Sequence, residues 1–110
     1  MNDITSADNA LRDQLERLLT GGLETEWRQR AYDNETVDNV VTRLHAAEPD
    51  DYVAKLTLAG FTDQPYTGES EDIIQACETC MYYVVNRKYC ELPALRLPVK
   101  PEWSCRLWRI

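Results

Sequence analysis

The chain has 110 residues, of which 44% are hydrophobic and 28% charged, as expected for one small globular domain. Its formal net charge of −7 disfavours general binding to nucleic acid, because phosphate groups repel an acidic surface. No stretch holds the roughly 18 consecutive apolar residues of a membrane helix. The N-terminus is polar and acidic, unlike a secretory signal, so we expect a cytoplasmic protein.

The first third of the chain predicts two helices. Ser6 is expected to cap the first, which ends at the glycine pair 21–22. Four leucines form its apolar stripe: Leu11, Leu15, Leu18 and Leu19. A short second helix is expected over residues 23–32, with Trp27 and Ala31 facing inward.

The middle of the chain predicts two more helices. Asp33 or Asn34 can cap the third, and its apolar residues have helical spacing: Val37, Val40, Val41 and Leu44. Residues 48–51 (EPDD) break that helix and favour the start of a fourth, because proline and acids suit a first turn. Val53, Leu56 and Leu58 are expected to pack inward, and Gly60 to end the helix.

The remaining chain predicts mostly loops. Residues 61–70 read as a loop, and residues 70–77 as a short helix leading into Cys77. The β-branched and aromatic residues 82–85 predict a short strand, and three later prolines exclude regular helix from Cys90 onward. We therefore expect a mainly α fold in one domain, 1–110. Its helical body would span 1–76 and its loop-rich, cofactor-binding segment 77–110.

All four cysteines lie in that C-terminal segment, with the spacing C-x2-C-x9-C-x14-C: Cys77, Cys80, Cys90 and Cys105. Thiols stay reduced in the cytosol, which disfavours two disulfides, and the ligand spacing favours metal binding over four unlinked thiols. Four thiolates suit Zn²⁺ or an iron–sulfur cluster. Structural zinc sites usually show two short cysteine pairs, and only the first pair is short here. We therefore expect a [4Fe–4S] cluster, with Zn²⁺ as the alternative.

Charge is divided unevenly along the chain. Residues 1–72 hold 6 Lys/Arg and 16 Asp/Glu, a net of −10, whereas residues 73–110 hold 6 Lys/Arg and 3 Asp/Glu, a net of +3. The basic residues near the cysteines would offset the negative charge of a cluster, or they are ordinary surface charges. They are Arg87, Lys88, Arg96, Lys100, Arg106 and Arg109.

The stretch 77–110 resembles the high-potential iron–sulfur protein pattern through its segments CETCMYY, RKYCELP and WSCRLW. The resemblance implies that the four cysteines ligate one [4Fe–4S] cluster, shielded by Tyr82, Tyr83, Trp103 and Trp108. In that family an aromatic residue directly precedes the fourth cysteine, whereas Trp103 stands two positions before Cys105. Similar clusters occur in accessory subunits of glycyl-radical enzymes. The tail is also similar to short uncharacterised bacterial and phage proteins.

These features predict a small iron–sulfur protein acting in electron transfer or redox sensing, with an unidentified protein partner and no membrane. We expect no enzymatic activity, because the chain has one histidine, His45, no Ser/His/Asp set and no phosphate-binding glycine loop. The alternative is an accessory or inhibitory protein, as phages encode, with a structural cluster or zinc and an acidic face for a basic partner. A zinc-containing DNA-binding regulator is a third possibility, which the net charge disfavours.

Overall fold

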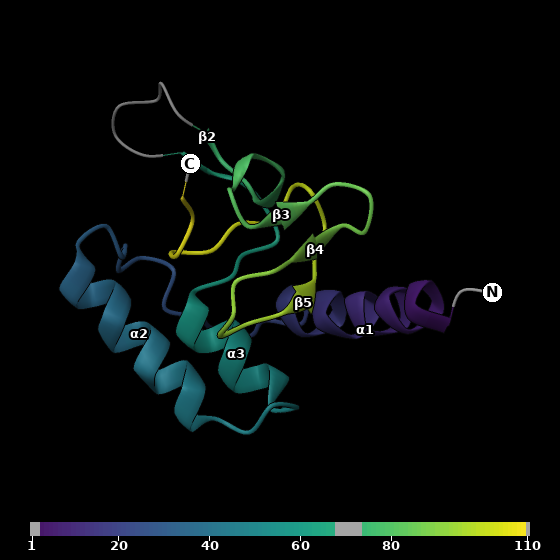
Figure 1. Ribbon diagram of the computed structural model, residues 1–110, viewed down its shortest axis with the longest axis horizontal. Coiled ribbons are helices and arrows are strands. Elements are labelled where there is room, and N and C mark those ends of the chain that lie inside the picture. Colours follow the sequence, from purple (N-terminus) through teal and green to yellow (C-terminus); the bar gives the residue numbers. More distant parts are fainter. Residues whose placement is uncertain (1–2, 68–73, 110) are drawn as a thin grey trace.

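The computed structural model describes residues 3–67 and 74–109 (Figure 1). Within these ranges, three α-helices are followed by short strands that form a two-stranded and a three-stranded antiparallel sheet. The fold is therefore a small mixed domain, and the expected mainly α class holds only for its first half. The elements are α1 (Asp3–Thr20), α2 (Asn34–Ala46), α3 (Tyr52–Ala59), β1 (Tyr66–Thr67), β2 (Ile74–Gln75), the 3₁₀ helix η1 (Cys77–Thr79), β3 (Tyr83–Val84), β4 (Tyr89–Cys90) and β5 (Leu97–Pro98).

Helix α1 carries the predicted leucine stripe. Leu15 is fully buried, and the other three leucines are partly buried against the core. The helix begins before Ser6, which therefore lies inside its first turns and is not its cap. At the other end, the N–H of Gly21 donates to the carbonyl of Arg17 at 2.9 Å, and the chain then turns.

The predicted second helix, over residues 23–32, is wrong. This segment forms bends and turns, and its backbone pairs with distant parts of the chain. The N–H of Glu26 donates to Thr57 O at 3.0 Å, and the N–H of Ala31 donates to Arg106 O at 3.3 Å. These long-range bonds replace the local bonds of a helix, so tertiary contacts override the helical pattern.

Helices α2 and α3 confirm the predicted third and fourth helices. Asp33 caps α2 by accepting from the N–H of Thr36 at 3.2 Å, and Val40 and Leu44 are buried on its inner face. The two helices pack against each other and lie together on one side of the molecule (Figure 1).

Asp51 caps α3 by accepting from the N–H of Ala54 at 3.1 Å, and Gly60 ends the helix in the left-handed conformation. Leu56 is fully buried as predicted. Val53, which was also expected to pack, is 47% exposed, because it lies on the outer face of this short helix.

The sheets occupy the second half of the chain. The strand predicted at 82–85 is present as β3, which pairs with β4, and β4 pairs with β5. Of the helix predicted over 70–77, residues 70–73 lie outside the described residues, whereas Ile74 belongs to strand β2, so that part of the prediction is wrong. From Cys90 onward the described residues contain no α-helix, as the prolines predicted.

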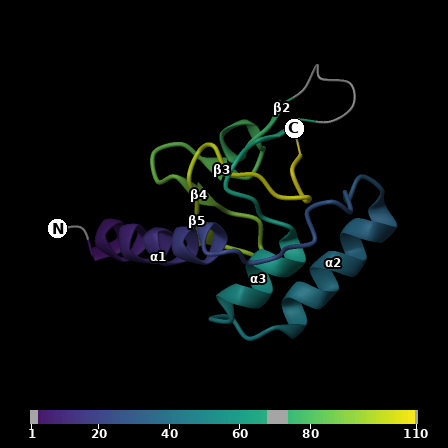
Figure 2. The same ribbon diagram turned by 180° about the vertical axis from the view of Figure 1, so that it is seen from behind.

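The three-stranded sheet lies beside α1, as both views show (Figures 1 and 2). Arg12 of α1 fixes this contact by donating to the carbonyls of Val99, Arg87 and Lys88 at 2.8–3.1 Å. The hydrophobic core draws on both parts of the chain, from Leu15 to Leu107. None of the helices in the described ranges is long and apolar enough to cross a membrane.

Candidate metal centre

The four predicted cysteines line a single apolar pocket. They come from three separate parts of the chain: the turn around η1, the central strand β4 and the segment after Trp103. All four are free thiols, so the two-disulfide alternative does not hold in this structure. Cys77, Cys90 and Cys105 are buried, whereas Cys80 is partly exposed and lies nearest to solvent.

Backbone hydrogen bonds hold the turn that carries the first two cysteines. The N–H of Cys77 donates to Trp103 O at 2.6 Å, and the N–H of Cys80 donates to Cys77 O at 3.0 Å. The N–H of Glu78 also donates to Pro101 O at 3.1 Å. The CxxC turn is therefore fixed to the segment that carries the fourth cysteine.

The other two cysteines have one backbone feature in common. The N–H of Leu92 donates a hydrogen bond to the Cys90 thiol, and the N–H of Leu107 donates to the Cys105 thiol. In each case the donor lies two residues after the cysteine. Such bonds stabilise the negatively charged thiolate and are a recognised means of tuning metal–sulfur centres.

Burial dominates the acidity of these thiols. Desolvation raises the pKa of Cys90 to about 11, and the N–H of Leu92 only partly opposes it. The pKa values of Cys77 and Cys105 are also raised, first by burial and then by the other cysteines. Without a metal, these thiols are therefore protonated near neutral pH, and a metal would have to displace their protons.

Two of the four aromatic residues that are expected to shield a cluster line the pocket. Tyr83 and Trp108 line the pocket, and the Nε1–H of Trp108 donates to Thr79 Oγ1 at 3.0 Å, which fixes the ring against the CxxC turn. Trp103 is buried behind the pocket, whereas Tyr82 is only partly buried. Neither belongs to the described residues that line the pocket.

Phe61 is a pocket residue that the sequence reasoning missed. It lines the pocket and meets Trp103 edge to face, with ring centroids 6.5 Å apart. The bridge between Thr62 and Ser104 brings it there, with backbone hydrogen bonds of 2.9 and 3.2 Å. Phe61 directly follows the Gly60 helix stop, but nothing in the sequence links it to the cysteines.

The basic residues of the tail mainly attach it to the acidic body. Arg87 pairs with Asp8 at 2.7 Å, and Lys100 pairs with Glu16. These ion pairs give the uneven distribution of charge a role in the fold, because basic residues of the tail neutralise acidic residues of the body. The charges of the two parts compensate one another within the fold, so these cations are not simply counter-charges for a cluster.

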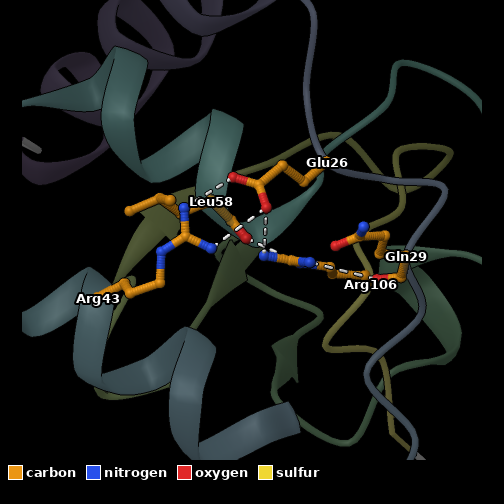
Figure 3. Close-up of polar contacts among 5 residues, drawn as sticks. All are labelled: Glu26, Gln29, Arg43, Leu58 and Arg106. Atoms are coloured by element: carbon orange, nitrogen blue, oxygen red, sulfur yellow. Dashed lines mark hydrogen bonds and ion pairs between the residues drawn. The ribbon is translucent and has the colours of Figure 1, made fainter.

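Arg106 makes the most buried of these attachments (Figure 3). Its guanidinium donates to the carbonyls of Leu58 and Gln29 at 2.9 and 3.3 Å and contacts Glu26 at 3.3 Å. Arg43 approaches the same carboxylate from α2 at 3.0 Å. Glu26 thus joins α2 to the tail at Arg106, the residue that directly follows Cys105 in the sequence.

The pocket is narrow, with a cavity of about 10 Å³. Among the described residues, no three His, Cys, Asp or Glu side chains stand close enough together to hold a metal ion. The thiols therefore surround a common space without converging on one point, and a cofactor would have to part the side chains. The chemistry of the lining, four sulfurs in an apolar wall, fits a metal–thiolate centre.

Comparisons with protein-family models, with curated proteins and with solved structures each found no match, so the resemblance to high-potential iron–sulfur proteins stays a prediction from three short motifs.

Proposed function

We propose that this protein binds one [4Fe–4S] cluster through its four cysteines and acts in electron transfer or redox sensing. The observation that carries the proposal is the meeting of all four thiols at one apolar pocket. Four thiolates in a water-excluding wall are the ligand set of such a cluster.

A cluster and a single zinc ion differ in the arrangement of thiols that they need. A zinc ion needs four sulfurs each about 2.3 Å from one point, whereas a cubane fills the space between its ligands. No three candidate ligands of the described residues stand close enough to hold an ion, so the preference for a cluster rests on the spacing of the cysteines in the sequence. The N–H groups of Leu92 and Leu107 add thiolate-stabilising hydrogen bonds at two of the four positions.

The partly exposed Cys80 gives the proposed centre its access to a partner. Electrons would pass most easily where the least protein separates the centre from solvent, and the other three cysteines are buried. The pocket aromatics Tyr83 and Trp108 would keep water from the remaining sides.

The decisive experiment is iron, zinc and acid-labile sulfide analysis of protein purified without oxygen, together with a visible spectrum. Close to four irons and four sulfides per chain, with a broad absorption band and a reversible redox couple, are expected. Iron and sulfide absent after anaerobic purification and after reconstitution would overturn the cluster.

Serine variants test whether the thiols act together. Cys77→Ser and Cys105→Ser should each lose most of the iron, because both thiols line the buried side of the pocket. Ser104→Ala is a matched control next to Cys105, since the Ser104 hydroxyl forms a hydrogen bond with the Thr62 hydroxyl and lies outside the pocket lining. Iron loss in the control equal to that in the cysteine variants would show a folding effect only.

One observation favours the alternative, an accessory or inhibitory protein with a structural metal. The narrowness of the pocket suits a single Zn²⁺ better than a bulky cluster. This alternative predicts one zinc per chain, no colour, and a stable complex with a basic partner that docks on the acidic body. The same metal analysis separates the two candidates.

A further inference from the structure

Arg30 has an unexplained donor beside the candidate centre. Among the buried side-chain nitrogen and oxygen atoms of the described residues, only its Nε lacks a hydrogen-bond partner. A buried N–H without a partner costs free energy, so native structures rarely leave one without a reason such as a bound ion or cofactor. Arg30 also forms no ion pair with a carboxylate of the described residues.

The rest of the Arg30 side chain is held firmly in place. Its Nη1 donates to Trp27 O at 2.8 Å, and its Nη2 donates to Gln75 Oε1 at 2.6 Å. The guanidinium also stacks on Tyr66, with its carbon 3.7 Å from the ring centroid. Gln75 is in turn held by donating from Nε2 to the hydroxyl of Tyr32 at 3.0 Å.

Arg30 reaches the fourth cysteine directly. Its Nη2 donates to the carbonyl of Cys105 at 3.2 Å. Arg30 belongs to the acidic body of the chain, outside the basic tail.

We infer that Arg30 is a positioning residue that holds the backbone of Cys105 in place and brings a guanidinium next to the fourth cysteine. This inference rests on the proposed four-cysteine site, whether it holds a cluster or zinc. An anionic centre at the pocket would attract this guanidinium, because a guanidinium binds anions with several donors at once. Three basic residues of the tail already form ion pairs with carboxylates of the body: Arg87 with Asp8, Lys100 with Glu16 and Arg106 with Glu26.

The test replaces Arg30 and measures metal affinity in the absence of any cluster. Co²⁺ alone, titrated into metal-free reduced protein, reports binding to thiolates by absorbance. Arg30→Gln should raise the Kd for Co²⁺ about tenfold or more, as expected for loss of one charge-assisted interaction. Arg30→Lys, which keeps the charge, should recover part of that loss. Arg28→Gln is the matched control, since Arg28 is exposed and its guanidinium lies over Trp27.

Two outcomes would overturn the inference. One is Co²⁺ binding by Arg30→Gln with the affinity of the unmodified protein. The other is an equal loss in Arg30→Gln and Arg28→Gln. If Arg30→Gln does not fold, Arg30→Lys decides the matter: its Kd for Co²⁺ should exceed that of the unmodified protein, because lysine cannot reproduce the contacts with Trp27, Gln75 and the Cys105 carbonyl, whereas the Kd of Arg28→Gln should not change. Failure of the unmodified protein to bind either Co²⁺ or iron would instead refute the proposed four-cysteine site.

Discussion

The buried cysteine thiols give the metal-free protein a characteristic sensitivity to alkali. The pKa of Cys90 is about 11 in the fold, against an ordinary value of 9.0. The unfolded chain therefore loses this proton first as pH rises, and the stability present below pH 9 is lost progressively between pH 9 and 11. We expect Cys90 to account for roughly 2 kcal/mol of lost stability by pH 10.5.

Urea unfolding of reduced, metal-free protein at pH 8 and pH 10.5 measures this loss. Cys90→Ser, whose hydroxyl does not titrate in this range, should lose correspondingly less stability over the same interval. An identical pH dependence in the two proteins would show that burial of this thiol does not govern the alkaline response.

Arg106 and Arg43 share one carboxylate but differ greatly in burial, as Figure 3 allows the reader to follow. The side chain of Arg106 is 2% exposed and that of Arg43 is 47% exposed. Arg106→Met would leave the carbonyls of Leu58 and Gln29 without donors, at a cost of about 3 kcal/mol. Arg43→Met should cost less than about 1 kcal/mol, since exposed ion pairs contribute little. Equal losses in urea unfolding would contradict this ranking.

At the scale of elements, the segment that ends α3 depends on one glycine. Gly60 has φ = 68°, and a Cβ at this position would stand 2.9 Å from Trp27 Cα and 3.0 Å from Glu26 O. These backbone atoms cannot easily move, because the N–H of Glu26 donates a hydrogen bond to the carbonyl of Thr57. Gly60→Ala should therefore lower the free energy of unfolding by more than about 2 kcal/mol.

Gly22 provides the matched control for this substitution. Its φ is also positive, at 102°, but a Cβ there would meet nothing within 4 Å. Gly22→Ala should therefore show only the cost of backbone strain, about 1 kcal/mol. Thermal unfolding of the two variants separates strain from steric contact, and a larger loss at Gly22 would refute the argument.

Elements with their own local signals could be predicted from the sequence. Helices α2 and α3 have capping aspartates, Asp33 and Asp51, and these interactions involve only neighbouring residues. The helix predicted over 23–32 does not form, because the N–H groups of Glu26 and Ala31 donate to the carbonyls of Thr57 and Arg106, far along the chain. Strands β1 and β2 lie close together in the sequence, but each has only two residues, which is too short to show the alternating pattern of a strand.

The residues of the candidate site likewise include some that the sequence predicts and some that it does not. The cysteines and the nearby aromatics Tyr83 and Trp108 could be found, because residue type and spacing indicate metal binding. Phe61 and Arg30 could not, since they reach the cysteine segment through the Thr62–Ser104 bridge and the Cys105 carbonyl. Residue type alone does not distinguish this arginine from the eleven other basic residues of the chain.

At the scale of the whole molecule, the proposed metal centre would stabilise the C-terminal half more than the helices. Segments 74–109 contain short strands and turns that meet at the cysteine pocket, whereas α2 and α3 pack on each other. Removing the metal should therefore lower Tm and increase amide hydrogen exchange first in 74–109. Hydrogen exchange that increases equally in α2 would show that the metal stabilises the entire fold uniformly.

The position of Cys105, held to the body by Arg30 and by the bridge at Ser104, has a consequence for biosynthesis. The ribosome makes Cys80 25 residues before Cys105, an interval of roughly 1–5 s at ordinary elongation rates. Throughout that time the earlier thiols lack both the fourth thiol and the wall formed by Trp108. Insertion of the proposed cofactor would therefore follow synthesis of Cys105, and the earlier thiols would depend on a reducing environment until then.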